Sequence, residues 1–318
     1  MKNDPRFQPL DASQSPRFAD IATFFRLPRH EVGPDVDIAL VGVPFDLGAN
    51  FRTGARQGPA SVREATRAIR RRHPVSGIEP FALCNVADLG DTPIHAFDLL
   101  GSLELIQDCF QKITDAGAMP LAIGGDHTIP LPILRILAKD RPVGVVQFDA
   151  HADTLDTLIG NKFNHATTFR RAVEEGLIDP KRTIQIGLRG SRFSADDVVY
   201  GEAVGMRLIT MEDYEAMGRN AVIGEIDRVT SDGATYVTFD IDGLDAAYAM
   251  GTGVPEVGGF NMRDAQAMLR SLQGKNLVGA DICEVAPMYD PTGQTQLNAA
   301  NLMFELLCIL ADSKTRHS

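Results

Sequence analysis

Three residues that could bind metal ions stand at alternate positions near the middle of the chain. Asp149, His151 and Asp153 follow an apolar run that begins at Val145 and is typical of a buried strand. In extended backbone, residues two apart point to the same side, so two carboxylates and one imidazole would converge at the strand end. Aspartate is also common in solvated turns, so this triplet alone leaves an ordinary loop as the alternative.

Two other segments place metal-binding side chains just after an apolar, strand-like run. His127 follows such a run in AIGGDHT, and Asp240 and Asp242 again stand two apart in TFDID. Ligands of open α/β sheets gather at the carboxyl ends of the strands, so the three segments could meet in one crevice. Together they would supply His127, Asp149, His151, Asp153, Asp240 and Asp242.

The composition of this set predicts a pair of divalent metal ions. Four carboxylates crowded together would repel one another strongly without cations. Oxygen-rich ligands with a minority of imidazoles suit Mn²⁺ or another borderline divalent ion. Four carboxylates exceed what one ion needs, which indicates two ions roughly 3.5–4 Å apart that make hydroxide available at neutral pH. Because the pattern recurs in three segments, solvated turns are a poor explanation.

The strands and helices that must position these residues alternate along the chain. Strands are expected at 37–43, 120–123, 144–148, 183–188, 207–209, 236–241 and 277–282. Helices are expected at 63–72, 103–113, 129–137, 168–175, 221–229 and 262–272. This alternation implies right-handed βαβ units and a mainly parallel sheet in a three-layer α/β fold. No linker divides the chain, so residues 1–318 are predicted to form one domain, with 1–33 as a polar N-terminal arm.

Composition argues against several classes of partner. The formal net charge of −11 makes nucleic acid and anionic membranes unfavourable partners. The run Arg70, Arg71 and Arg72 is expected in the last turn of a helix, where cations suit the helix dipole. The first twenty residues lack an apolar signal-peptide core, and no apolar run is long enough to span a bilayer. A cytoplasmic location is therefore expected.

Six motifs together resemble those of the ureohydrolase (arginase/agmatinase) family. In order between about Pro34 and Leu310 they are GGDHT, FDAHADT, HATTFRRAVEEGL, TFDIDGLD, GTGVPEVGG and GADICEVAP. The sequence looks most similar to the agmatinase and guanidinobutyrase branch. The resemblance implies an arginase-like three-layer α/β/α fold with two divalent ions, Mn²⁺ in the first place and Ni²⁺ as the alternative. It also implies a trimer or hexamer, which could include a paralogous subunit.

The resemblance divides the six candidate ligands into two overlapping sets. One ion would be held by His127, Asp149, Asp153 and Asp240. The other would be held by Asp149, His151, Asp240 and Asp242. Asp149 and Asp240 would therefore bridge the two ions, and every ligand position of the family pattern is filled.

Three residues receive catalytic roles from the same resemblance. His165, in NHATTF, matches the family's proton-shuttling histidine, and Glu256, in GTGVPE, matches the acid that pairs with the guanidinium group of a small cationic substrate. Asp153 would additionally orient the hydroxide. The implied reaction is attack of metal-bound hydroxide on the central guanidino carbon, with His165 assisting proton transfer to the departing amine.

Around the expected pocket, the chain departs from the family pattern in one direction. Relatives usually carry Asn, Gly, Thr, Ser and Pro where this chain has Leu155, Ala166, Val254, Ala286 and Met288. A pocket with fewer polar partners should bind a carboxylate tail poorly. We therefore expect cleavage of an alkylated guanidine or biguanide, such as metformin, which would give guanylurea and dimethylamine. The alternative is an agmatinase or guanidinobutyrase activity that releases urea.

Two other classes of function stay open at this level. A single-zinc deacetylase is one, because the ureohydrolase fold resembles that of the deacetylases, and a count of bound ions would separate the two. The other is a mainly structural subunit that assists a catalytic paralogue, which turnover by the purified chain alone would exclude.

Overall fold

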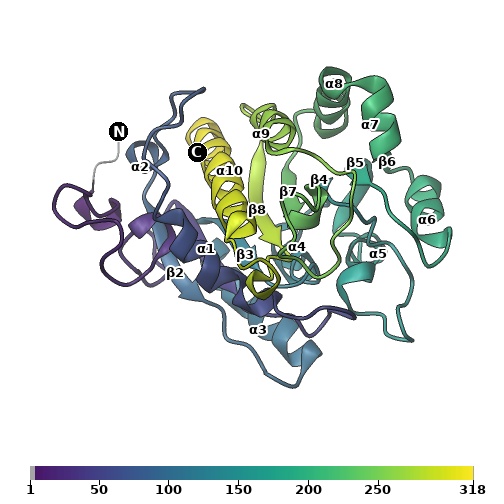
Figure 1. Cartoon of the computed structure of the whole chain (residues 1–318), viewed down its shortest axis with the longest axis horizontal. Coiled ribbons are helices and arrows are strands. Elements are labelled where there is room, and N and C mark those ends of the chain that lie inside the picture. The colour runs from purple at the N-terminus through teal and green to yellow at the C-terminus, as the bar shows by residue number, and fades with distance from the viewer. Residues whose placement is uncertain (1–3, 318) are drawn as a thin grey trace.

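The computed structural model describes residues 4–317, which build one eight-stranded sheet with all paired strands parallel. The strands are β1 (Ile38–Val43), β2 (Val86–Asp91), β3 (Met119–Gly124), β4 (Val143–Phe148), β5 (Ile178–Leu188), β6 (Arg207–Thr210), β7 (Thr235–Asp240) and β8 (Leu277–Cys283). Their order across the sheet is β2-β1-β3-β8-β7-β4-β5-β6 (Figure 1). Parallel neighbours require long crossover connections, and most of these connections contain helices.

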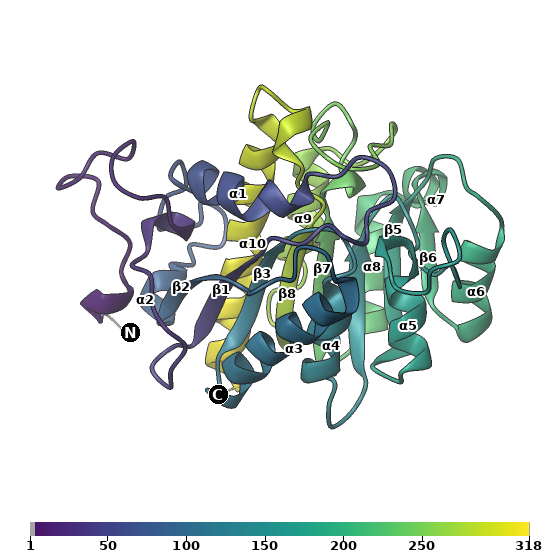
Figure 2. The same cartoon turned by 90° about the horizontal axis from the view of Figure 1, so that it is seen from below.

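The helices form two layers, one on each face of the sheet, as Figure 2 shows. One layer contains α3 (Leu99–Asp115), α4 (Pro130–Leu137), α5 (Thr168–Glu174) and α6 (Asp196–Val204). The other contains α1 (Gly58–Thr66), α2 (Pro80–Leu83), α7 (Met211–Met217), α8 (Arg219–Thr230), α9 (Met262–Arg270) and α10 (Gln294–His317). Single 3₁₀ turns occur at Pro5–Phe7, Phe24–Arg26, Ala55–Gln57, His165–Thr167, Ile241–Gly243 and Pro287–Tyr289. A separate apolar cluster lies in each interface, which confirms the predicted three-layer α/β/α fold.

The strands and helices form where the local patterns favour them. Every residue of β1, β4 and β7 is buried, as expected for apolar strands with helices on both faces. In α3, the Asp98 side chain accepts a hydrogen bond from Gly101 N and so caps the first turn. Leu103, Ile106 and Phe110 recur at helical spacing and are buried against the sheet.

The structure corrects several sequence-based element predictions. Strand β2 and helices α2, α6, α7 and α10 were not predicted. Strand β5 begins five residues earlier than expected, at Ile178, and its pairing with β4 is irregular near Pro180, where a regular ladder would lack a donor. Helix α1 ends at Thr66, so Arg70, Arg71 and Arg72 follow the helix instead of forming its last turn. Arg71 Nη2 instead donates to Pro9 O, because the N-terminal segment offers a carbonyl there.

The N-terminal segment is anchored in the apolar core. Residues 1–3 of the predicted arm lie outside the described residues. Farther along, Phe24, Phe25 and Leu27 are buried in the same cluster as α1 and α10. The carboxylate of Asp88 accepts hydrogen bonds from Phe24 N and from Arg63 Nε, which ties the segment to β2 and α1. Polar composition had hidden these apolar anchors.

Among residues 4–317, none of the helices combines the length and the apolar content needed to cross a bilayer.

Candidate metal centre and active site

Four strands that are consecutive across the sheet deliver acids and a histidine to one edge. Asp149 directly follows β4, Asp240 closes β7, and His127 follows β3 in the turn that leads to α4. Strand β8 lies between β3 and β7 and ends next to Glu284. The carboxyl ends of parallel strands share an edge, so segments more than 100 residues apart along the chain meet there.

The first half of the ligand cluster surrounds the imidazole of His127. Its Nδ1 lies 2.9 Å from Asp149 Oδ2, 2.9 Å from Asp153 Oδ2 and 3.4 Å from Asp240 Oδ2. All four residues are buried. The structure therefore brings together the four residues that were assigned to one ion.

The second half of the cluster surrounds His151. Its Nδ1 lies 3.1 Å from Asp242 Oδ2 and 3.5 Å from Asp149 Oδ1. Asp149 thus turns one oxygen to each imidazole, which is the placement a bridging ligand needs. Asp240 groups with His127 and Asp149, and no ion pair joins Asp240 to His151 within residues 4–317.

Electrostatics in this cluster favour bound cations. Burial and repulsion from Asp149 raise the pKa of Asp153 to about 7. Burial and neighbouring carboxylates also raise the pKa of Asp240 and Asp242. Burial disfavours charge on Asp149 too, but its interactions with His127 and His151 outweigh this and lower its pKa. These crowded carboxylates resist ionisation, and bound divalent cations would stabilise their ionised form.

The orientation of His127 leaves one ring nitrogen available for a metal ion. Thr238 Oγ1 donates to Asp281 Oδ1 at 2.7 Å and lies 2.8 Å from His127 Nε2. Because the hydroxyl proton is used on Asp281, Nε2 must carry the proton and donate to Thr238. Tyr236 holds Asp281 from the other side, through a 2.5 Å hydrogen bond to Oδ2. In the neutral ring that a metal ion requires, Nδ1 is then the unprotonated nitrogen. It is buried and has no well-aligned hydrogen bond among the described residues, so this site fits a divalent ion.

His165 stands at the wall of the same cavity, at the start of a 3₁₀ turn capped by Asn164. Its Nδ1 lies 3.1 Å from Glu284 Oε1, and its Nε2 lies 2.9 Å from Asn50 Oδ1. Burial lowers the pKa of His165, but the Glu284 carboxylate more than compensates and raises it to about 9. The imidazole is therefore held as a proton donor at neutral pH.

Glu284 and Asn50 were not proposed as site residues from the sequence. Glu284 Oε1 accepts from His127 N at 2.9 Å, so this side chain links the metal cluster to His165. The signal that identified Asp149 and Asp240, an acid just after an apolar strand, is also present in GADICEVAP and would have identified Glu284. Asn50 lies in the loop after β1, and no local pattern marks it.

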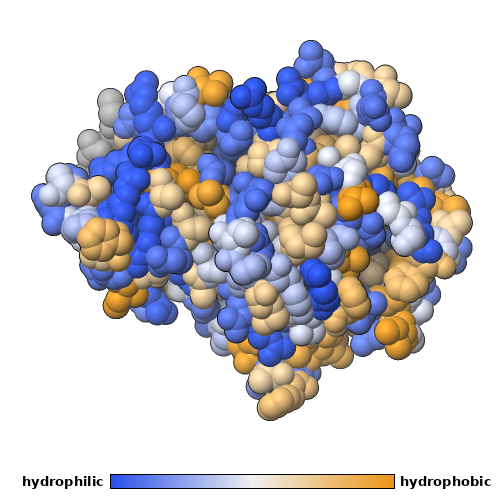
Figure 3. All heavy atoms as spheres, in the orientation of Figure 1, coloured by the Kyte–Doolittle hydropathy of each residue, from blue (hydrophilic) through white to orange (hydrophobic). Residues whose placement is uncertain are grey.

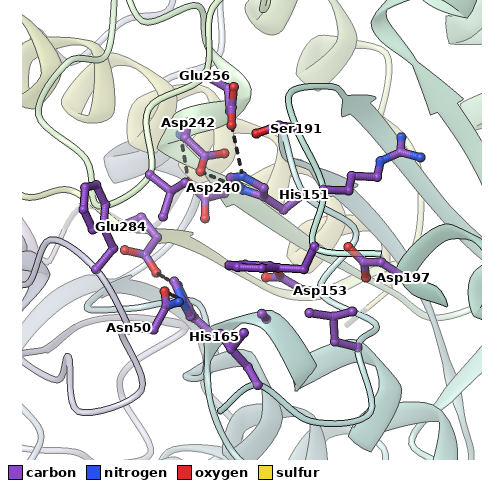
Figure 4. A pocket seen from close by; sticks show the side chains of 17 residues that line it. Asn50, His151, Asp153, His165, Ser191, Asp197, Asp240, Asp242, Glu256 and Glu284 are labelled. Atoms are coloured by element: carbon purple, nitrogen blue, oxygen red, sulfur yellow. Dashed lines mark hydrogen bonds and ion pairs between the residues drawn. The ribbon is translucent and has the colours of Figure 1, made fainter. Parts of the chain in front are cut away.

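A cavity of about 310 Å³ opens above these groups. Figure 4 shows Glu256 beside Asp242 and His151, and Asn50, His165 and Glu284 together at another wall. Glu256 Oε1 lies 4.0 Å from His151 Nε2. The lining also contains Phe51, Leu158, Ser191, Arg192, Phe193 and Asp197, none of which was predicted.

Three of the five residues that depart from the family pattern line this cavity. They are Leu155, Ala166 and Val254. Ala286 is fully buried and does not line it. Met288 does not line it, contrary to the expectation, because the 3₁₀ turn Pro287–Tyr289 directs its side chain onto Gly54.

Comparison with known proteins agrees with this geometry. The family model described as "Arginase family" matches residues 36–308. The chain is 49% identical to guanidinopropionase of Pseudomonas aeruginosa over 317 residues, which cover 99% of both proteins. It is 43% identical to guanidinobutyrase of the same organism, covering 95% of the chain and 96% of the relative. Proclavaminate amidino hydrolase from Streptomyces clavuligerus superposes with a TM-score of 0.90 at 35% identity, covering 94% and 100% of the two chains.

Proposed function

Because the chain belongs to the arginase family of ureohydrolases, metal-dependent hydrolases of amidino C–N bonds, we propose that it hydrolyses a guanidino acid to urea and an amino acid. The observation that carries the proposal is the cluster of two imidazoles and four carboxylates beneath a cavity that contains two further glutamates. Two relatives are named for guanidino acids, which supports this substrate class.

The six ligands fit two divalent ions. The oxygen-rich donor set favours Mn²⁺, with Ni²⁺ as the alternative. When bound, such ions would supply Lewis-acid chemistry and activate water at neutral pH. A ligand set large enough for two ions also argues against a single-zinc deacetylase, and its completeness argues against a merely structural subunit.

Two carboxylates are placed to bind the guanidinium group. Glu256 has the motif match, and it lies beside His151. Glu284 offers an Oε2 that is buried and has no hydrogen-bond partner among the described residues, although its residue lines the cavity. A carboxylate accepts two parallel hydrogen bonds from a guanidinium fork, which fixes orientation as well as affinity. We propose that the two acids hold the group from different sides.

His165 provides the proton that the departing amine needs. Addition of water to the central guanidino carbon gives a tetrahedral intermediate. His165 then donates a proton to the tail nitrogen as the C–N bond breaks, so that the tail departs as an amine and urea remains. The contacts with Glu284 and Asn50 hold the imidazole protonated until that step.

The relatives support urea release over the biguanide cleavage expected from the sequence. The apolar side chains Phe51, Leu155, Leu158 and Val254 still favour an alkylated guanidine or biguanide as the second candidate substrate. However, five polar or charged residues that were not predicted also line the cavity: Asn50, Ser191, Arg192, Asp197 and Glu284. The loss of polar partners inferred from the sequence is therefore incomplete.

Product release by metal-defined protein tests the proposal. Urea and amine should be measured with 3-guanidinopropionate, 4-guanidinobutyrate, agmatine and metformin, with chelated protein as the control. We expect the largest kcat/KM for a guanidino acid. A larger kcat/KM for metformin, with dimethylamine as product, would establish the second candidate instead.

A further inference from the structure

We propose that Arg192 binds the carboxylate tail of the substrate and selects guanidino acids over amines, an inference that rests on the proposed function. Arg192 lines the same 310 Å³ cavity as His165 and the metal ligands. Within residues 4–317, its guanidinium makes no ion pair or hydrogen bond. All of its donors are therefore available to a ligand.

The charges of the cavity wall make this arginine distinctive. Asp153, Asp197, Asp240, Asp242, Glu256 and Glu284 all line the cavity, whereas among the described lining residues Arg192 is the one permanent cation. Divalent ions would offset the carboxylates that bind them, but Asp197, Glu256 and Glu284 would still repel an anionic tail, which therefore needs a local positive partner. Arg192 supplies one, and its planar fork matches a carboxylate in two parallel hydrogen bonds.

The backbone next to Arg192 lies beside Glu256, the acid expected to bind the guanidinium group of the substrate. Arg189 is buried and donates to the carbonyl oxygens of Asp242 and Glu256, which anchors the end of β5. At Gly190 the chain turns with φ +75°, and a Cβ there would lie only 2.3 Å from Glu256 Cδ. The backbone at Gly190 therefore packs directly against Glu256, and Ser191 lies near Glu256 in Figure 4.

Asp197 is the competing residue, because a carboxylate in the lining would favour a cationic tail such as that of agmatine. Its Oδ1 already accepts from Thr154 N at 2.9 Å and from Thr154 Oγ1 at 3.0 Å. No ion pair joins Asp197 to Arg192 in the described part of the chain, so the arginine is not neutralised by it. An ammonium tail would meet an uncompensated guanidinium, whereas a carboxylate tail would pair with it.

Substitution of Arg192 tests this assignment with three substrates that share a guanidino head. These are 4-guanidinobutyrate, agmatine and butylguanidine, whose tails are anionic, cationic and neutral. In Arg192→Met, kcat/KM for 4-guanidinobutyrate should fall about ten- to a hundredfold, mainly through KM, because a charged hydrogen-bonded pair is lost. The value for butylguanidine should stay unchanged and that for agmatine should rise. Arg192→Lys should retain more activity toward the acid than Arg192→Met.

Arg141→Met is the matched control. Arg141 is exposed, has no partner among residues 4–317 and precedes β4, at the end of the sheet opposite the metal cluster. The Arg141→Met substitution removes the same charge and should leave kcat/KM for all three substrates unchanged. A Met variant at position 192 that loses activity equally on all three substrates would show a structural role of the loop and overturn the proposal.

Calorimetric binding separates failure of this inference from failure of the proposed function. In metal-loaded His165→Ala protein, in which slow turnover preserves the ligand, adding Arg192→Met should weaken the Kd of 4-guanidinobutyrate about ten- to a hundredfold. An equal Kd would overturn the role of Arg192 even if urea is released normally. Wild-type protein that cleaves no guanidino compound would instead refute the proposed function, and the Kd comparison would still decide the role of Arg192.

Discussion

Asp149 turns one carboxylate oxygen toward His127 and the other toward His151, at 2.9 and 3.5 Å from their Nδ1 atoms. It is held in this position by Gln147 Nε2, at 2.7 Å, and by its place at the end of a fully buried strand. A buried carboxylate with so little freedom to move is already arranged for two ions, so little ordering remains when they bind.

Asp149→Asn should remove metal binding and activity together, because one lost charge weakens both halves of the cluster. Elemental analysis should find fewer than two ions per chain, and Asp240→Asn should behave similarly. Asp197→Asn, an equivalent change in the cavity wall, should retain both ions. Retention of two ions by Asp149→Asn would contradict the bridging assignment.

His165→Ala should retain both ions while turnover falls about 10²–10⁴-fold, the usual worth of general acid–base catalysis. The reason is that His165 contacts Glu284 and Asn50 and none of the six ligands within hydrogen-bond distance. Elemental analysis and kcat would be measured on the same preparation. An unchanged kcat would remove His165 from the mechanism.

Glu284→Gln should shift the pH dependence of kcat. His165 acts in its protonated form, so activity is lost as pH rises through its pKa, which the Glu284 carboxylate helps raise to about 9. Removing that charge lowers the pKa of His165, and the alkaline limb should move to lower pH. Glu256→Gln should weaken substrate binding but leave this limb in place. Identical pH profiles of kcat for Glu284→Gln and wild type would show that Glu284 does not set the pKa of His165.

Among the elements, the N-terminal segment, α1 and β2 depend on one buried ion pair. Arg63 Nε and Nη2 lie 3.0 and 3.1 Å from the two oxygens of Asp88, and the same carboxylate accepts from Phe24 N. Both side chains are almost fully buried. Arg63 also pairs with the more exposed Asp91, whereas no other ion pair to Asp88 is seen among residues 4–317, so the charge of Asp88 depends on Arg63. This pair holds the edge of the sheet that lies farthest from β6.

Arg63→Met should therefore lower the free energy of unfolding by about 3–5 kcal/mol, because Asp88 would be left as an uncompensated buried charge. Chemical denaturation measures the change. Adding Asp88→Asn should recover part of the loss, since the stranded charge is then gone. Arg219→Met removes an arginine from a more exposed pair with Asp264 and should cost at most about 1 kcal/mol. Equal losses in Arg63→Met and Arg219→Met would refute the argument.

For the whole molecule, the metal cluster concentrates negative charge at the centre of the carboxyl edge of the sheet. On the face in Figure 3, strongly hydrophobic residues appear in small separate groups among hydrophilic ones. The loop before α3 projects from the molecule (Figure 1), and Phe97 in it is fully exposed. The one-domain organisation, the trimer or hexamer, a paralogous subunit and the cytoplasmic location all stay predictions.

Chelation should lower the thermal midpoint, and Mn²⁺ should restore it. Without cations, the pKa of Asp153 rises from its ordinary value of 3.8 to about 7, so the folded state binds protons that the unfolded state has released. Metal-free protein should therefore lose stability as pH rises between these values. Free Mn²⁺ at about 100 times its Kd would add about 2.7 kcal/mol. Asp149→Asn protein should show little response to Mn²⁺; a shift equal to that of wild type would contradict the model of the site.

The sequence by itself determined the fold class and predicted the candidate ligand set. Both depend on local regularities: alternate positions in extended backbone share a side, and fully buried parallel strands are continuous apolar runs. The triplet that begins at Asp149 and the pair Asp240 and Asp242 could therefore be placed at strand ends before any tertiary contact was known.

Only the tertiary structure decided which distant residues share the cavity. His165 meets Glu284 across 119 positions and Asn50 across 115, contacts that follow from the strand order and from loops with no local pattern. Arg192 was hidden for the same reason. Met288 was misplaced because its motif lies next to the site in sequence, whereas a single 3₁₀ turn directs the side chain elsewhere. Backbone periodicity sets the direction of neighbouring side chains, but it carries no information about the turns and crossovers that bring remote ones together.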